Sequence, residues 1–119
     1  MSGRRDVEAY LADMVAAMES IIALTAGLPD STVMDERAPL RGHVLHQLTM
    51  LGEAAKHLPP EVASRIPEVP VDAMCRLRDR IVHYYFGVDD AVIVSTMRVS
   101  LPRDLPAVRA LLEQLETGD

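Results

Sequence analysis

Apolar residues recur every three or four positions along most of the chain, the spacing that places side chains on one face of an α-helix. Across residues 4–26 this face is formed by Val7, Leu11, Met14, Met18 and Ile21. Gly27, Pro29 and Asp30 follow, and residues of these types commonly end a helix. The pattern predicts a long first helix, followed by one helical turn at residues 31–35.

A second long helix is predicted from residues 36–39 to about His57. Pro39 suits its first turn, because a helix does not use the N–H groups there. Pro59 and Pro60 end the pattern, and a short helix is expected at residues 61–66, between prolines. The apolar face of the long helix is formed by Leu40, Val44, Leu48, Leu51 and Ala55.

A third long helix is expected to begin near Val71, with Asp72 as its N-cap. It should fray at residues 85–87, where a glycine follows aromatic residues. Its inward-facing residues should be Met74, Leu77 and Ile81.

The last helix is predicted to begin at Asp89 and Asp90, because acidic side chains are favoured at the positive end of a helix. Proline removes a backbone donor, so the helix should be kinked or broken around Pro102 and Pro106 before it resumes at residues 108–115. No segment shows strand-like alternation. The sequence therefore predicts an all-α fold, an antiparallel bundle of four or five helices in a single domain over residues 1–119. The apolar faces are broad, which favours a homodimer.

Composition narrows the function further. The net charge of −6 argues against a protein that coats nucleic acid with a basic surface, but local phosphate contacts remain open. No apolar run approaches the roughly 20 residues that span a bilayer, and the N-terminus lacks the apolar centre of a signal peptide. Cys75 is the single cysteine, so no intrachain disulfide can form. We expect a cytoplasmic protein with no membrane partner.

The histidines outside residues 76–90 give little support for a metal site. His43 and His46 are three residues apart on the second helix and could share a metal ion. No acidic residue follows one turn later, so surface histidines are the favoured interpretation. His57 falls at a helix C-terminus, where a cation is favourable anyway.

The segment RLRDRIVHYYFGVDD, residues 76–90, gathers three arginines, a histidine and three of the four aromatic residues. A histidine can take a proton from a ribose 2′-OH or give one to the leaving oxygen, and an arginine can stabilise charge on the phosphate. Arg78 and His83 would therefore suit a metal-independent ribonuclease without a cofactor. They could equally satisfy carbonyls at a helix end. Side chains five residues apart on a helix point about 140° apart around its axis. Arg78 and His83 therefore reach one phosphate only if the helix ends between them or two copies share a site.

Residues 78–89 resemble the R-x4-H-x-Y signature and following FGVD of the HepT family, toxin ribonucleases with a HEPN domain. The similarity continues in LGEAAKHLP at residues 51–59, IPEVP at 66–70 and DLPAVRALLEQL at 104–115. This resemblance implies an all-helical homodimer with endoribonuclease sites in a cleft at the dimer interface. It also implies a partner, an MntA-type nucleotidyltransferase antitoxin that silences the nuclease by transferring AMP to the motif tyrosine.

Carried onto this chain, the resemblance makes Arg78 and His83 catalytic and Tyr85 the AMPylation target, with Tyr84 a packing residue. Asp79 stands where the family often has Asn, so it could orient the arginine or repel RNA. RNA is the expected substrate, with tRNA as one candidate. A second hypothesis is a non-catalytic HEPN subunit that binds substrate or nucleotide for a partner nucleotidyltransferase, and a third is a purely structural dimer.

Glu53 is a separate candidate for support of the site. Its neighbours Gly52, Ala54 and Ala55 are small, which lets another helix approach closely. A carboxylate at such a contact commonly pairs with arginine, and Arg78 is the expected partner. A solvated Glu53 on the polar face is the alternative.

Overall fold

The computed structural model describes residues 3–118, and every regular element in that range is helical. The predicted all-α class is therefore confirmed. The elements are α1 (Arg4–Thr25), α2 (Asp30–Val33), α3 (Pro39–Lys56), α4 (Pro60–Ala63), α5 (Val71–His83), the 3-10 turn η1 (Tyr85–Gly87), α6 (Asp90–Ser95), the π-helical turn η2 (Thr96–Ser100) and α7 (Leu101–Glu116).

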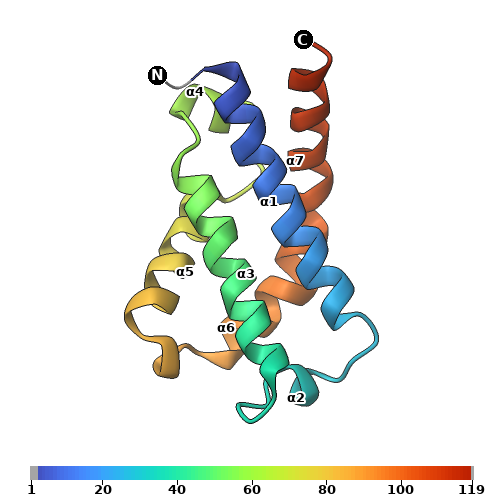
Figure 1. Cartoon of the computed structure of the whole chain (residues 1–119), viewed down its shortest axis with the longest axis vertical. Helices are drawn as coiled ribbons and strands as arrows, with labels where there is room; N and C mark the ends of the chain where they lie inside the picture. Colours follow the sequence, from blue (N-terminus) through green and yellow to red (C-terminus); the bar gives the residue numbers. More distant parts are fainter. Residues whose placement is uncertain (1–2, 119) are drawn as a thin grey trace.

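Four long helices, α1, α3, α5 and α7, form the antiparallel bundle (Figure 1). Helix α3 lies between α1 and α5, and α1 lies between α3 and α7. The two ends of the chain lie at the same end of the bundle, whereas α2 and α6 lie towards the opposite end (Figure 1). Helix α5 is thus an outer helix that packs mainly on α3, which leaves much of its surface free for other contacts.

The third long helix begins at Val71, as predicted, but its N-cap differs from the prediction. The N-cap of α5 is Pro70, and Asp72 lies in the first turn without capping it, so the predicted cap at Asp72 is wrong. A carboxylate in that turn still faces the positive end of the helix. Asp89 does cap α6, because its Oδ1 accepts a hydrogen bond from the N–H of Ala91 at 2.9 Å.

The last helix was expected to be kinked or broken around Pro102 and Pro106, and regular α-helix is interrupted only before Pro102. Helix α7 runs without interruption through Pro106. Pro102 lies in the first turn, where its missing N–H costs nothing, and the π-helical turn η2 immediately precedes it. The chain therefore adapts to the first proline by a local change in winding and loses only one helical hydrogen bond at the second.

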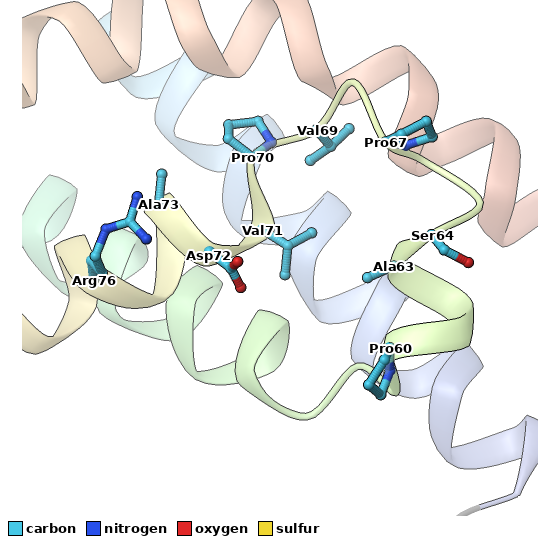
Figure 2. Close-up of a pocket in the computed structure, with 10 residues that line it drawn as sticks. All are labelled: Pro60, Ala63, Ser64, Pro67, Val69, Pro70, Val71, Asp72, Ala73 and Arg76. Carbon is cyan, nitrogen blue, oxygen red and sulfur yellow. The ribbon is translucent and has the colours of Figure 1, made fainter.

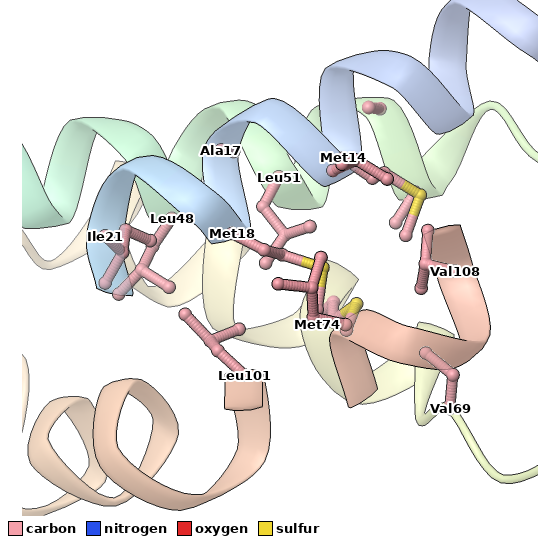
Figure 3. Packing of buried hydrophobic residues seen from close by; sticks show 14 of the residues in the cluster. Met14, Ala17, Met18, Ile21, Leu48, Leu51, Val69, Met74, Leu101 and Val108 are labelled. Atoms are coloured by element: carbon pink, nitrogen blue, oxygen red, sulfur yellow. The ribbon is translucent and has the colours of Figure 1, made fainter. Parts of the chain in front are cut away.

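One hydrophobic core fills the space between the helices (Figure 3). Helices α1, α3 and the α6–α7 segment supply most of its fully buried side chains, and burying each is worth roughly 1.5–3 kcal/mol. Helix α5 adds only two buried residues, Met74 and Ile81. The largest fully buried side chains are Leu11, Met14, Met18, Ile21, Leu45, Leu48, Leu51, Ile93, Met97 and Leu101.

Arg98, within η2, ties the connection between α1 and α2 to the segment that joins α6 and α7. Its guanidinium donates to the carbonyl of Thr25 at 2.8 Å, to the carbonyl of Leu28, and to Asp30 Oδ1 at 3.0 Å. Gly27 lies within this connection at φ 73°, a left-handed conformation that glycine adopts readily. The carbonyls at the end of α1 thereby gain a charged partner.

The broad apolar faces that suggested a dimer are largely buried within the bundle. Exposed apolar side chains gather instead at the end of α5 and in η1, where Val82, Tyr84, Tyr85 and Phe86 follow closely in sequence. Phe86 is 92% exposed. Among the helices described, none combines the length and apolarity needed to cross a bilayer.

Candidate active site

Arg78 is positioned by a close approach of α5 to α3. Gly52 is buried at this contact, and a Cβ on it would collide with Cβ of Arg78 and lie 2.8 Å from the carbonyl oxygen of Met74. The expectation that small residues beside Glu53 allow another helix to approach is therefore confirmed at Gly52. The absence of a side chain there sets the position of the Arg78 backbone.

Two carboxylates hold the Arg78 guanidinium. Nη2 lies 3.0 Å from Glu53 Oε2, and Nη1 donates a hydrogen bond to Asp79 Oδ1 at 3.0 Å. The predicted ion pair between Glu53 and Arg78 is thus present. The Arg78 side chain is only 23% exposed, and its Nε is buried without a hydrogen-bond partner among the described residues. A largely buried, doubly paired guanidinium has a fixed orientation.

The ion pair continues towards α1. His57 Nε2 lies 3.5 Å from Glu53 Oε1, one turn along α3, and the His57 ring stacks on Tyr10 with centroids 4.9 Å apart. We call Tyr10, His57, Glu53, Arg78 and Asp79 the Arg78 network. His57 was expected only as a residue at a helix end, and its role in this network was not predicted, although its four-residue spacing from Glu53 was a visible signal.

His83 is the last residue of α5 and is exposed. Its ring makes an edge contact with Tyr84, at a centroid distance of 6.4 Å. Helix α5 is unbroken between Arg78 and His83, so the option that the helix ends between them is wrong. The two residues are separated by about 140° around the axis and about 7.5 Å along it. Within one chain the two side chains therefore leave α5 in different directions.

Tyr85 begins the turn η1 and folds back onto the first turn of α3. Its hydroxyl lies 3.4 Å from the position a Cβ would take at Gly42, and its ring meets Phe86 edge-on at 5.2 Å. Tyr85 is 41% exposed, whereas Tyr84 is 69% exposed, so the description of Tyr84 as a packing residue does not fit this chain alone.

No group of three or more potential metal ligands occurs within the described part of the chain. His43 and His46 both lie on the exposed side of α3. A cavity of about 450 Å³ lies away from the motif (Figure 2). It is lined by the start of α5 together with α4 and the proline-rich segment that joins them, and Asp72 and Arg76 are its only charged residues. The candidate active site is therefore formed by the charged residues of α3 and α5 around Arg78, together with His83.

The protein class follows from this geometry and from comparison with known proteins. The model of the family described as "Ribonuclease HepT-like" matches residues 14–115. "Probable ribonuclease HepT" of Thermococcus cleftensis is 31% identical over 113 residues, 94% of this chain and 97% of the relative. "Putative RNase MJ0127" of Methanocaldococcus jannaschii is 29% identical over 116 residues, 98% and 95% of the two chains. No solved structure gives a significant match.

An all-helical bundle with an arginine and a histidine on one outer helix is consistent with the HEPN class of proteins. The chain belongs to the HepT-like ribonuclease family, and the resemblance drawn from its sequence is confirmed.

Proposed function

We propose that this protein is the toxin of a HepT/MntA-type toxin–antitoxin system, a metal-independent endoribonuclease that cleaves RNA, with tRNA as a candidate substrate. The observation that carries the proposal is the Arg78 network, because it holds an arginine in fixed orientation on the helix that ends in an exposed histidine. Membership of a ribonuclease family supports the reaction class.

The proposed reaction needs no cofactor. His83 takes the proton from a ribose 2′-OH, and the 2′-oxygen attacks the adjacent phosphorus while the bond to the 5′-oxygen breaks. The departing 5′-oxygen receives the proton that His83 took up, and the products are a 2′,3′-cyclic phosphate end and a 5′-hydroxyl end. Arg78 stabilises the extra negative charge on the phosphorane-like transition state. Acid–base catalysis of this kind contributes roughly 10²–10⁴-fold.

A homodimer would complete the site. Within one chain the helix directs Arg78 and His83 to different sides of α5. A two-fold axis near the end of α5 would place two copies of each residue around one groove and would cover the exposed Val82. Charge at the groove also matters, because Arg78 already contacts two carboxylates. An RNA phosphate would replace the exposed Asp79 more easily than Glu53.

Silencing by an MntA-type nucleotidyltransferase is the regulatory part of the proposal. Transfer of AMP to Tyr85 would add bulk and a negative charge beside the groove. Intact mass spectrometry after co-expression with such an enzyme tests this: one or more AMP groups on wild type and none on Tyr85→Phe are expected. A wild-type chain of unchanged mass, or equal modification of Tyr85→Phe, would remove Tyr85 from the proposal.

The nuclease is tested with purified chain, a mixed RNA substrate that includes tRNA, and excess EDTA. Cleavage should persist in EDTA, leave 2′,3′-cyclic phosphate ends, and fall at least about 100-fold in His83→Ala, the lower end of the range for acid–base catalysis. His46→Ala is the matched control, since it removes an exposed histidine outside the motif. Cleavage that requires metal, or that survives His83→Ala, contradicts the mechanism. A chain that binds the nucleotidyltransferase but never cleaves RNA would favour the non-catalytic subunit.

A further inference from the structure

A second cavity, of about 350 Å³, lies where the turn η1 meets the start of α3. It is lined by Glu36, Ala38, Pro39, Arg41, Gly42, Tyr85 and Phe86. Its volume is within the range of small-ligand sites, about 300–1,000 Å³. It is separate from the Arg78 network, because Gly42 and Gly52 are ten residues, or about 15 Å, apart along α3.

Arg41 is the unusual residue of this cavity. Its side chain is only 7% exposed, and buried arginines normally have all their donors satisfied. One contact is present, from Nη2 to Asp90 Oδ1 at 3.0 Å. The buried Nε has no hydrogen-bond partner within the described residues. The guanidinium offers five N–H donors, so most of its capacity is not used by Asp90.

The backbone adds to the positive potential at the same place. Arg41 lies in the first turn of α3, whose N–H groups have no acceptor within the helix. No side chain caps this helix, and its first turn contains no acidic residue. A cation at the positive end of a helix is unfavourable unless an anion accompanies it. The N-terminus of α3 and the Arg41 guanidinium together form a typical anion-binding site.

Two carboxylates oppose an anion here. Asp90 is half exposed and shares its charge with Arg41. Glu36 lines the cavity but is exposed, so solvent and salt screen it. Two aromatic residues also line the cavity, Tyr85 and the almost fully exposed Phe86. An exposed aromatic ring beside a phosphate site is suited to stack on a base.

We infer that this cavity binds a mononucleotide, with its phosphate held by Arg41 and the first turn of α3 and its base stacked on Phe86. The phosphate site follows from geometry alone, whereas the choice of AMP as the nucleotide rests on the proposed modification of Tyr85. An AMP group joined to the Tyr85 hydroxyl would have its phosphate one bond from that oxygen, beside Gly42 and the Arg41 side chain.

The test uses the unmodified full chain in a ¹H–¹⁵N NMR titration at constant ionic strength, with AMP, inorganic phosphate and adenosine as separate probes. AMP and phosphate should shift the backbone amides of Leu40, Arg41 and Gly42, and AMP should bind more tightly than phosphate. Adenosine alone should leave the Arg41 amide unmoved. Absence of these shifts overturns the anion site, and phosphate binding as tightly as AMP overturns the assignment to a nucleotide.

Variants separate binding from structural support. Arg41→Gln should weaken AMP binding about tenfold or more, the loss expected for a charge-assisted hydrogen bond. Arg37→Gln makes the same charge change at an exposed arginine four residues earlier and should bind normally. Asp90→Asn should strengthen binding, because it frees Arg41. If Arg41 serves only to tie α3 to α6, Asp90→Asn will lower thermal stability without strengthening AMP binding, and that result overturns the proposal.

These outcomes are independent of the nuclease. If the chain cleaves RNA but binds no AMP, the proposed function stands and this inference is wrong. If it binds AMP but does not cleave RNA, the inference stands and the proposed function is wrong. Arg41→Lys keeps the charge and offers a second variant if Arg41→Gln does not fold. Arg41→Lys should bind AMP more weakly than wild type and Asp90→Asn, because lysine is a point charge without the planar fork of arginine. It should bind AMP more tightly than Arg41→Gln, because it keeps the positive charge.

Discussion

Gly52 of α3 and Arg78 of α5 touch directly, with no room for a side chain on the glycine. The contact affects both the packing of α3 on α5 and the candidate active site, because Glu53, next to Gly52 on α3, pairs with Arg78 on α5. Any group added at Gly52 must move the backbone that bears the arginine.

Gly52→Ala should therefore lower the free energy of unfolding by about 1–3 kcal/mol, the usual cost of overpacking, and reduce RNA cleavage as well. Urea denaturation and cleavage rates measure the two effects. Gly42→Ala is a matched comparison in the same helix, because a Cβ there would lie 3.4 Å from the Tyr85 hydroxyl. It should be neutral or gain up to about 1 kcal/mol in stability. Equal stability of the two variants would show that the α3–α5 contact yields easily.

Asp79→Asn should lower the KM for RNA by about two- to fivefold, equivalent to the loss of a partly exposed ion pair worth up to about 1 kcal/mol. Asp79 is 57% exposed and accepts a hydrogen bond from Arg78, so its removal frees the guanidinium for phosphate. Glu113→Gln, at an exposed site on α7, makes the same change in net charge. A KM that rises in Asp79→Asn would mean that the carboxylate orients Arg78 instead.

Glu53→Gln should reduce kcat for cleavage several-fold while leaving KM little changed, because Glu53 fixes the orientation of Arg78 without facing substrate. The variant also loses the contact to His57. Cleavage kinetics and thermal unfolding provide the measurement. Unchanged cleavage together with unchanged stability would show that the ion pair has no supporting role.

Arg98→Gln should cost about 2–3 kcal/mol of stability, since charge-assisted hydrogen bonds to two carbonyls and one carboxylate are lost. Arg109→Gln offers the comparison, because Arg109 pairs only with Glu19 at the surface. That pair should be worth less than about 1 kcal/mol. Chemical denaturation distinguishes them, and similar losses for both variants would count against the importance of Arg98 at the end of α1.

Cys75 should react slowly with alkylating reagents at neutral pH. Burial raises the pKa of its thiol, with Asp72 and Asp79 adding to the effect, so less of the reactive thiolate is present. A thiol pKa raised in the folded state also means that stability falls as pH rises above the ordinary value of 9.0. Alkylation rates of folded and urea-unfolded chain at one pH provide the measurement. Equal rates would contradict the prediction.

Local chemistry explains why much of the fold was predictable. The 3–4-residue apolar spacing and the prolines at residues 39, 59 and 60 determine α3 almost to its ends. The kink or break predicted around Pro102 and Pro106 does not occur at Pro106, because tertiary packing keeps α7 continuous despite a missing hydrogen bond. The cap at Asp72 was wrong because Pro70 and the segment before it determine where α5 begins.

The site was predictable where it depends on neighbours in sequence or on small residues. Glu53 beside Gly52 indicated a close helix contact, and Arg78 is indeed its partner. The burial of Arg41 and the stacking of Tyr10 on His57 depend on how α3 meets η1 and α1, which spacing alone does not determine. The homodimer and the roles of His83 and Tyr85 stay predictions.

Helix α3 also works as a spacer of fixed length. It is unbroken between Gly42, beside Tyr85, and Gly52, beside Arg78, so these two points are held about 15 Å apart. A single group attached to Tyr85 is therefore remote from the Arg78 guanidinium of the same chain. Inhibition through Tyr85 would act by obstructing the path of the RNA strand along α3, and short RNA substrates should escape it more readily than long ones.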